Sequence, residues 1–199
     1  MDFKGASEYI VQRLNSELSP SLFYHTPGHS LDVLTAIRKL GETEDIDDHA
    51  RILLDTAALF HDAGMLVQYH DHEAFSVTLC HEILSGFGYS DTELDQISSL
   101  ILVTRLPQHP ANILEQIICD ADLDYLGRDD YFINSFKLRL EWQVNGIRNT
   151  TLNEWFDLQV KFLSEHHYFT KSAFNLRNAK KMANLAELRT IVNNSGPQL

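Results

Sequence analysis

Histidine and aspartate residues in the first 125 positions have the types and the spacing of a metal site. The chain has ten histidines, and seven of them lie between residues 25 and 81. Imidazole nitrogens and carboxylate oxygens bind divalent ions such as Mn, Fe, Co, Ni, Zn and Mg. Such an ion lowers the pKa of a bound water and offsets charge on a phosphoryl oxygen. The alternative is that the histidines are scattered over the surface without a common role. Their positions on the expected helices distinguish a metal site from this alternative.

Helical periodicity selects four of these residues as facing inward, because positions i, i+4 and i+7 share one face of a helix. His29 is four residues before Val33, on the apolar stripe of its expected helix. His61 and Asp62 each follow a core-facing alanine by four residues, and Asp122 follows a core-facing isoleucine by four. Several buried polar groups must satisfy one another, and a metal ion does so most simply.

Helical periodicity places the remaining candidate ligands less definitely. His72 opens onto the buried stripe of its helix, whereas His109 comes only after Pro107. If residues 111–126 form one continuous helix, Asp120 and Asp124 lie opposite Asp122, in solvent or behind the ligands.

The elements that must position these side chains are all expected to be helices. The chain has 5 prolines and 9 glycines, which separate helically periodic segments, and strand-like alternation is rare. No linker divides the chain, so we expect one domain over residues 1–192 and a flexible tail over 193–199. The expected helices span about 5–18, 28–40, 48–62, 70–86, 91–104, 111–126, 129–145, 151–165 and 171–192.

Composition excludes several classes of protein. The chain has 199 residues and a net charge of −12, which disfavours a nucleic-acid duplex or an anionic membrane as partner. No apolar run approaches the ~20 residues that span a bilayer, and the N-terminus lacks a signal peptide. Cys80 and Cys119 lie far apart in sequence, so we expect no disulfide framework and a cytoplasmic location.

In order and spacing, these residues resemble the HD-domain superfamily of metal-dependent phosphohydrolases, whose pattern is a lone histidine, a His-Asp pair and a distant aspartate. The segment from Tyr24 to Val33 resembles the Tyr-His-x-x-x-His start of several HD proteins. His72 to Ser76 resembles the His-Glu-x-x-Ser helix that commonly follows the pair. The resemblance extends over about 24–142, and Asp120 to Gly127 is similar to the small standalone predicted HD phosphohydrolases.

The resemblance implies an all-α, single-domain HD-type bundle with the C-terminal helices packed on the core. It implies His29, His61, Asp62 and Asp122 as ligands of a divalent ion, the same four residues that the helical faces select. One ion is the default, and a second would be held by His72 and His109.

The expected function is hydrolysis of a phosphoester of a nucleotide or other small phosphorylated metabolite. Asp62 is a candidate base or orienting group, with His25 and Glu73 at the edge of the site. The candidate phosphate contacts are Arg105, Lys137 and Arg139. The alternatives are a non-catalytic HD module that senses a nucleotide or metal, and an HD-type di-iron oxygenase, which needs two further histidines.

The segment after residue 142 carries no site that the sequence identifies. Trp142, Trp155, Phe156 and Phe162 recur at helical spacing. They predict either core packing, which we favour, or the surface of a homodimer.

Overall fold

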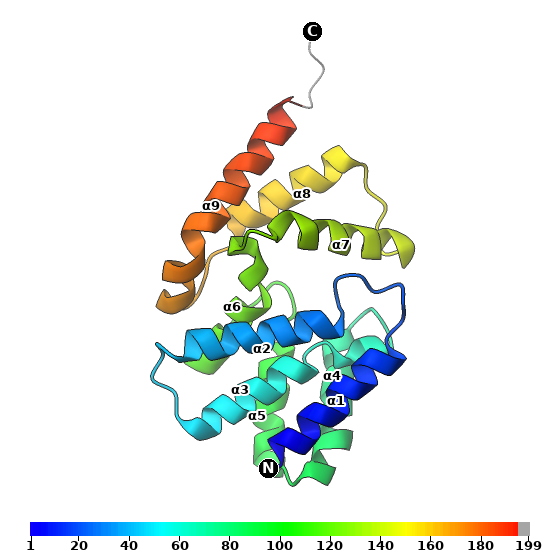
Figure 1. Ribbon diagram of the computed structural model, residues 1–199, viewed down its shortest axis with the longest axis vertical. Helices are drawn as coiled ribbons and strands as arrows, with labels where there is room; N and C mark the ends of the chain where they lie inside the picture. The colour runs from blue at the N-terminus through cyan, green and yellow to red at the C-terminus, as the bar shows by residue number, and fades with distance from the viewer. Residues whose placement is uncertain (195–199) are drawn as a thin grey trace.

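Helices make up the secondary structure of residues 1–194, which are the residues that the computed structural model describes (Figure 1). The prediction of an all-α fold is confirmed. The helices are α1 (Phe3–Glu17), α2 (Pro27–Gly41), α3 (Asp48–Phe60), α4 (His72–Leu84), α5 (Asp91–Leu102), α6 (Ile113–Asp122), α7 (Tyr131–Val144), α8 (Leu152–Glu165) and α9 (Lys171–Asn194). Short 3₁₀ helices are η1 (Ala63–Leu66), η2 (Ser85–Phe87) and η3 (Asp124–Gly127).

Side-chain caps explain where several helices begin. Thr26 accepts a hydrogen bond from the His29 backbone N–H, and Pro27 occupies the first turn of α2, where its missing N–H costs nothing. The capping boxes before α5 and α8 pair Ser or Thr with a Glu three residues later. These local signals place the helix starts close to the predicted positions.

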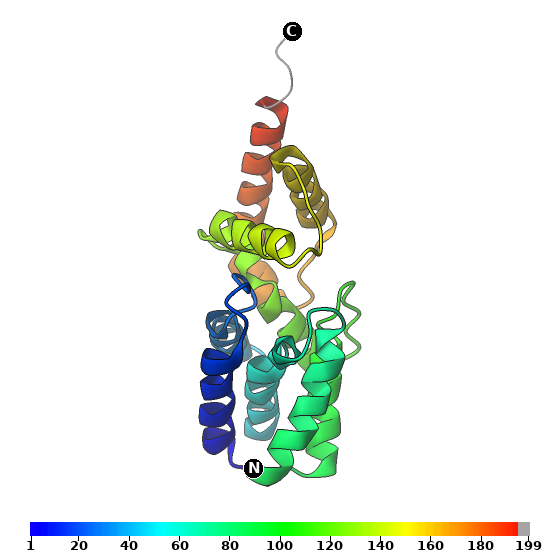
Figure 2. The ribbon, with the colours of Figure 1, turned by 90° about the vertical axis from the view of Figure 1, so that its right-hand side faces the viewer.

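The main core lies among α1 to α6, which pack side by side in the lower half of Figure 2. Their apolar faces meet in one cluster, and each fully buried Leu, Ile or Phe contributes about 1.5–3 kcal/mol. The most deeply buried members include Ile10, Leu54, Phe60, Ile97, Ile101, Ile117 and Ile118.

The C-terminal helices α7, α8 and α9 lie above the main core, as Figures 1 and 2 show, and contribute to a second apolar core. Leu126 and Tyr131 join Leu163, Leu185 and Leu188 in it. The start of α9 also reaches the main core through Ala173. This arrangement agrees with the prediction that the C-terminal helices pack on the core.

Two residues of the predicted flexible tail, 193–199, lie within the described part of the chain. Positions 193 and 194 are the last residues of α9, and the flexibility of the tail stays a prediction. The rest of the predicted tail, 195–199, lies outside the described residues.

The expected single helix over 111–126 is wrong. It ends at Asp122, and the backbone turns at Leu123 into η3. Asp120 and Asp124 are only 1% and 4% exposed. Of the two places expected for them, in solvent or behind the ligands, the first is excluded, because α9 and the segment before it cover both side chains. The periodicity of one helix does not contain that contact.

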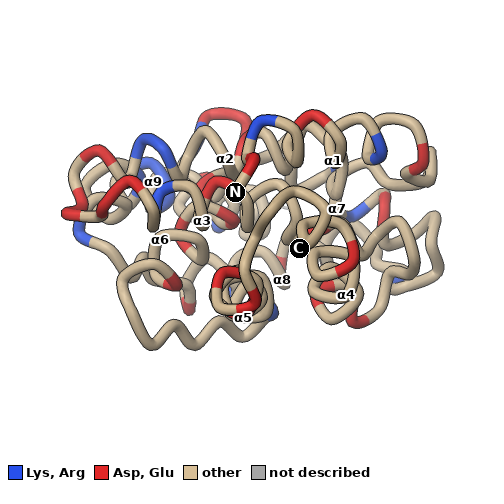
Figure 3. Tube along the Cα trace, turned by 90° about the horizontal axis from the view of Figure 1, so that it is seen from below, with Lys and Arg blue, Asp and Glu red and all other residues tan. Residues whose placement is uncertain are grey.

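Figure 3 shows acidic positions distributed over most of the helices, with fewer basic positions among them. This distribution fits the net charge of −12. No helix among residues 1–194 is long and apolar enough to cross a membrane.

Candidate metal centre

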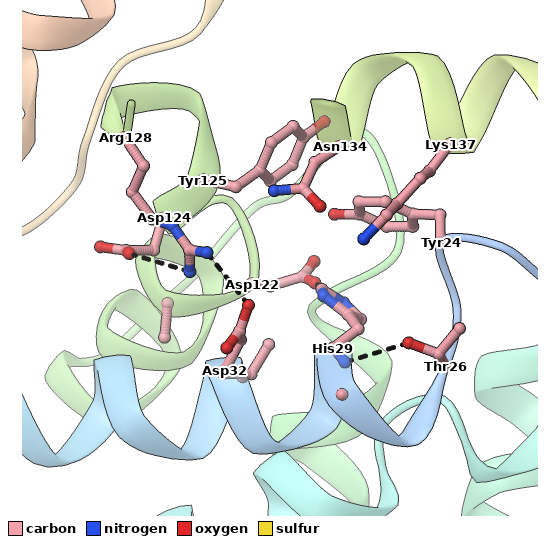
Figure 4. A pocket seen from close by; sticks show the side chains of 13 residues that line it. Tyr24, Thr26, His29, Asp32, Asp122, Asp124, Tyr125, Arg128, Asn134 and Lys137 are labelled. Carbon is pink, nitrogen blue, oxygen red and sulfur yellow. Dashed lines mark hydrogen bonds and ion pairs between the residues drawn. The ribbon is translucent and has the colours of Figure 1, made fainter. Parts of the chain in front are cut away.

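Helix ends bring the four predicted ligands to one place. His29 lies in the first turn of α2, and His61 and Asp62 immediately follow α3. Asp122 is the last residue of α6. Figure 4 shows His29 and Asp122 facing each other across the gap between their helices. Residues from three separate parts of the chain therefore share one site.

Their donor atoms are close together. His29 Nε2 lies 3.2 Å from Asp122 Oδ1 and 3.3 Å from His61 Nε2. Asp62 Oδ2 lies 3.1 Å from His61 Nε2 and 3.5 Å from His29 Nε2. His29, His61 and Asp122 form one group that could hold an ion, and Asp62 lies against the two histidines of that group.

The protonation of His61 shows that this cluster fits a cation. Its Nδ1 lies 2.8 Å from the Ala58 carbonyl oxygen, so Nδ1 carries the proton of the neutral ring. The lone pair of Nε2 then faces the carboxylates, and Asp62 Oδ2 is buried without a hydrogen-bond donor. Buried acceptors that face one another are costly unless a positive charge lies between them.

The same geometry shifts the pKa values of the cluster. Burial opposes a charge on His61, but the carboxylates of Asp62 and Asp122 outweigh burial and raise its pKa well above the usual value. Burial also opposes ionisation of Asp122, yet contacts with His29 and His61 lower its pKa to about 2. The carboxylates therefore favour positive charge beside them. A proton on the His61 ring supplies it when no ion is bound, and a divalent ion that replaced this proton would leave the ring neutral.

Ser76 and Gly64 hold the His-Asp pair against α4. The Gly64 N–H donates to Ser76 Oγ at 2.7 Å, and that hydroxyl donates to the His61 carbonyl at 2.6 Å. A Cβ on Gly64 would lie 1.9 Å from the backbone oxygen of His72. Only glycine permits this close approach of η1 to α4.

A second cluster shares Asp62 with the first. His72 Nε2 lies 3.1 Å from Asp62 Oδ1, while its Nδ1 lies 3.1 Å from the Tyr69 carbonyl. A ring nitrogen of His25 completes a group of three possible ligands with Asp62 and His72. The two oxygens of Asp62 thus face two neighbouring clusters.

The structure does not bring His109 to this second cluster. His109 is exposed on the loop after α5 and belongs to neither group of possible ligands. His25 occupies the third position because the loop before α2 folds over the site. The direction of that loop was open in the sequence, since Pro27 separates His25 from the helix.

Glu141, which the sequence did not single out as a site residue, holds this loop. One of its oxygens accepts the backbone N–H groups of Phe23, Tyr24 and His25 at 2.8–3.1 Å. The other contacts His25 Nδ1 and accepts the Tyr69 hydroxyl. Its partners lie more than 70 residues away in sequence, so no local pattern identifies them.

The predicted phosphate contacts separate into three environments. Arg105 lines a large cavity beside the second cluster and pairs with Asp71 at 3.0 Å and Glu73 at 3.5 Å. Lys137 lines a small pocket behind the first cluster. Arg139 donates to Thr150 and lines neither space.

Glu73 is buried on α4 with His72 as its neighbour, 3.8 Å from Nε2 of that ring. It is therefore beside the second cluster, on the side of the large cavity. Its position fits a supporting acid better than an exposed helix residue.

Two hollow spaces reach the metal centre. The small pocket has a volume of about 150 Å³, and Figure 4 shows Lys137 and Asn134 above His29 and Asp122 within it. The large cavity has a volume of about 740 Å³ and contains Asp62 in its lining. Tyr24, Asp122 and Tyr125 line both, so the centre forms part of the wall between them.

Comparison with known proteins finds one family model, described as HD domain, which matches residues 27–124. The matched segment contains the four predicted ligands, His29, His61, Asp62 and Asp122, and ends at the start of η3, before α7. No curated protein and no solved structure matches the chain.

Proposed function

Because the chain belongs to the HD-domain family through residues 27–124, we propose that it is a metal-dependent phosphohydrolase. Its substrate would be a phosphoester of a nucleotide or another small phosphorylated molecule. One observation carries the proposal: ring nitrogens of His29 and His61 converge with an oxygen of Asp122, and Asp62 Oδ2, beside both rings, is buried with no donor.

A bound Mn, Mg, Fe, Co, Ni or Zn ion would supply an acidified water and a charge that offsets the phosphoryl group. This local charge matters because the chain as a whole carries −12 and would repel an anion. The nitrogen and carboxylate ligand set suits all of these ions, so it does not select one of them.

The chain's own residues would perform the remaining tasks. Asp62 would orient the attacking water and accept its proton. His25, held by Glu141 at the edge of the large cavity, would protonate the leaving oxygen. Arg105 would contact a phosphoryl oxygen from the same cavity.

The decisive test is phosphate release by purified protein from a panel of nucleotides and phosphate esters. Each ester is tested with each divalent ion in turn, after the protein has been stripped with a chelator. We expect release that returns only with metal. Absence of release from every ester and metal combination, by protein that binds a metal ion, would contradict the proposal.

The second cluster gives the oxygenase alternative a specific basis, because His25 and His72 are two further histidines beside Asp62. Iron content and oxygen uptake separate the two functions. Two irons per chain with oxygen consumption would favour the oxygenase, and one divalent ion with phosphate release would exclude it. Protein that binds a nucleotide without metal or turnover would instead be a sensor.

A cytoplasmic location belongs to the same proposal. Cys80 and Cys119 are both buried and unpaired, as in a reducing compartment. A homodimer also stays a prediction, although Trp155 is buried within the chain rather than on its surface.

A further inference from the structure

The large cavity has one polar side and one apolar side. Its polar side carries Asp62, His25 and His72 from the metal centre. Its apolar side comes from α7 and α8, which lie outside the segment that the HD domain model matches. The apolar lining consists of Leu138, Trp142, Trp155, Leu158 and Phe162.

This cavity is poor in free positive charge. Arg105 and Lys161 are the only Lys or Arg side chains among its lining residues in the described part of the chain. Arg105 is already paired with two carboxylates, and Lys161 lies beside Glu165. A ligand with several phosphates would find too few cations here, whereas one phosphate needs only the metal and Arg105.

The size of the cavity fits an organic group rather than a bare phosphate. About 740 Å³ lies within the range of roughly 300–1,000 Å³ that is typical of small-molecule sites. The tryptophans form an edge-to-face pair with ring centroids 5.4 Å apart. Aromatic and aliphatic surfaces of this kind bind ligands through burial of apolar area.

We propose that the α7–α8 wall makes the enzyme specific for a phosphate monoester whose organic part is large, uncharged and aromatic. The phosphate would lie at the metal centre and the aromatic part against Leu138, Trp142 and Leu158. This inference rests on the proposed function for the phosphate end, but the apolar half of the site stands on the cavity alone.

Binding to the apolar half can be measured without metal or turnover. The chain has two tryptophans, and both line the cavity, so intrinsic fluorescence reports on this space. The probe is 4-nitrobenzyl alcohol, an uncharged aromatic quencher. We expect saturable quenching in the metal-free protein.

The variant Leu158→Asp places a charge on the apolar wall and should weaken probe binding by about tenfold, equivalent to ~1.4 kcal/mol. Leu152→Asp is the matched control, because Leu152 lies on the same helix, is 50% exposed and lines no cavity near the site. Leu158→Ser replaces the charged variant if circular dichroism shows a loss of helix.

Activity provides the second measurement. With metal, we expect kcat/KM for 2-naphthyl phosphate to exceed that for glycerol phosphate by at least tenfold, with a smaller ratio in Leu158→Asp. Unsaturable quenching, or equal quenching in Leu158→Asp and Leu152→Asp, would overturn the inference. If no ester is hydrolysed but the quenching behaves as expected, the apolar site stands and the proposed function fails.

Discussion

Two pairs of aspartates, close together in the structure, have opposite surroundings; Asp62, Asp120 and Asp124 are buried and Asp122 is half-buried. Asp120 and Asp124 lie under the start of α9, and protein donors satisfy them. Asp120 accepts two backbone N–H groups and the Thr170 hydroxyl at 2.7–2.8 Å. Asp124 accepts two hydrogen bonds from Arg177 at 2.6 and 2.9 Å.

Asp62 and Asp122, at the candidate metal centre, face the imidazole nitrogens of His29 and His61, and Gln108 donates to Asp122 Oδ2 at 3.4 Å. An oxygen of Asp62 is buried with no donor, and Asp122 lies among imidazole nitrogens that the first cluster orients inward. A buried carboxylate that protein donors satisfy stabilises the fold, whereas one that faces other acceptors requires a cation from outside. Burial alone therefore does not separate a structural acid from a ligand, but the nature of its neighbours does.

The largest expected effect is that of Asp62→Ala on activity. Loss of the carboxylate shared by both clusters should reduce phosphate release by about 10⁴-fold, ~5.5 kcal/mol in the barrier. Helical content should be unchanged, because no protein donor satisfies the buried Asp62 Oδ2. Phosphate release and circular dichroism measure the two effects, and full activity in this variant would remove Asp62 from the site.

Asp124→Ala should have the largest effect on stability. It leaves Arg177 without its partner and should lower the free energy of unfolding by about 3 kcal/mol. Urea denaturation measures this loss, with Asp129→Ala as the control. Asp129 is 97% exposed and pairs with Lys180, so its removal should cost less than about 0.5 kcal/mol. Equal losses would show that α9 is not held by Asp124.

Metal binding should stabilise the protein through Asp62 and Asp122 and not through Asp120 and Asp124. At a free metal concentration of 100 times Kd, the gain is about 2.7 kcal/mol. For a chain of this size, that gain raises Tm by roughly 5–10 °C. A thermal scan with and without Mn²⁺ should show this rise in wild-type protein and in Asp120→Asn, but not in Asp62→Ala. A rise of the same size in Asp62→Ala would place the ion elsewhere.

The smallest expected effect is that of Asp120→Asn on stability. Burial already raises the pKa of Asp120 and disfavours its charge. The amide keeps the shape and one acceptor oxygen, so the loss should be about 1–2 kcal/mol, smaller than for Asp124→Ala. Urea denaturation compares the two variants directly. A larger loss in Asp120→Asn would mean that the segment before α9, rather than Arg177, carries the attachment.

Much of the metal centre follows from local sequence. His29, His61, Asp62 and Asp122 each share a helical face with apolar residues. The structure groups His29, His61 and Asp122, with Asp62 against the two histidines. The helix starts follow from capping residues such as Thr26. Both features depend on neighbours within about four residues, a distance over which helical geometry is regular.

Other features depend on contacts between distant segments. Glu141 contacts His25 over 116 residues of sequence, and Asp120 meets Thr170 over 50. His109 stays outside both clusters because the loop that carries it folds away from them. Arg139, on α7, donates instead to Thr150 in the loop that follows this helix. Periodicity carries no information on such pairings.

The amino-acid sequence indicates a helical bundle and four inward-facing candidate metal ligands, because each of those properties is local to a helix. Only the fold shows which buried acids protein donors satisfy, as for Asp120 and Asp124, and which carry a buried oxygen without a donor, as for Asp62. It also decided that α7 and α8 enclose a cavity beside the ligands, because that depends on which surfaces the distant helices bury.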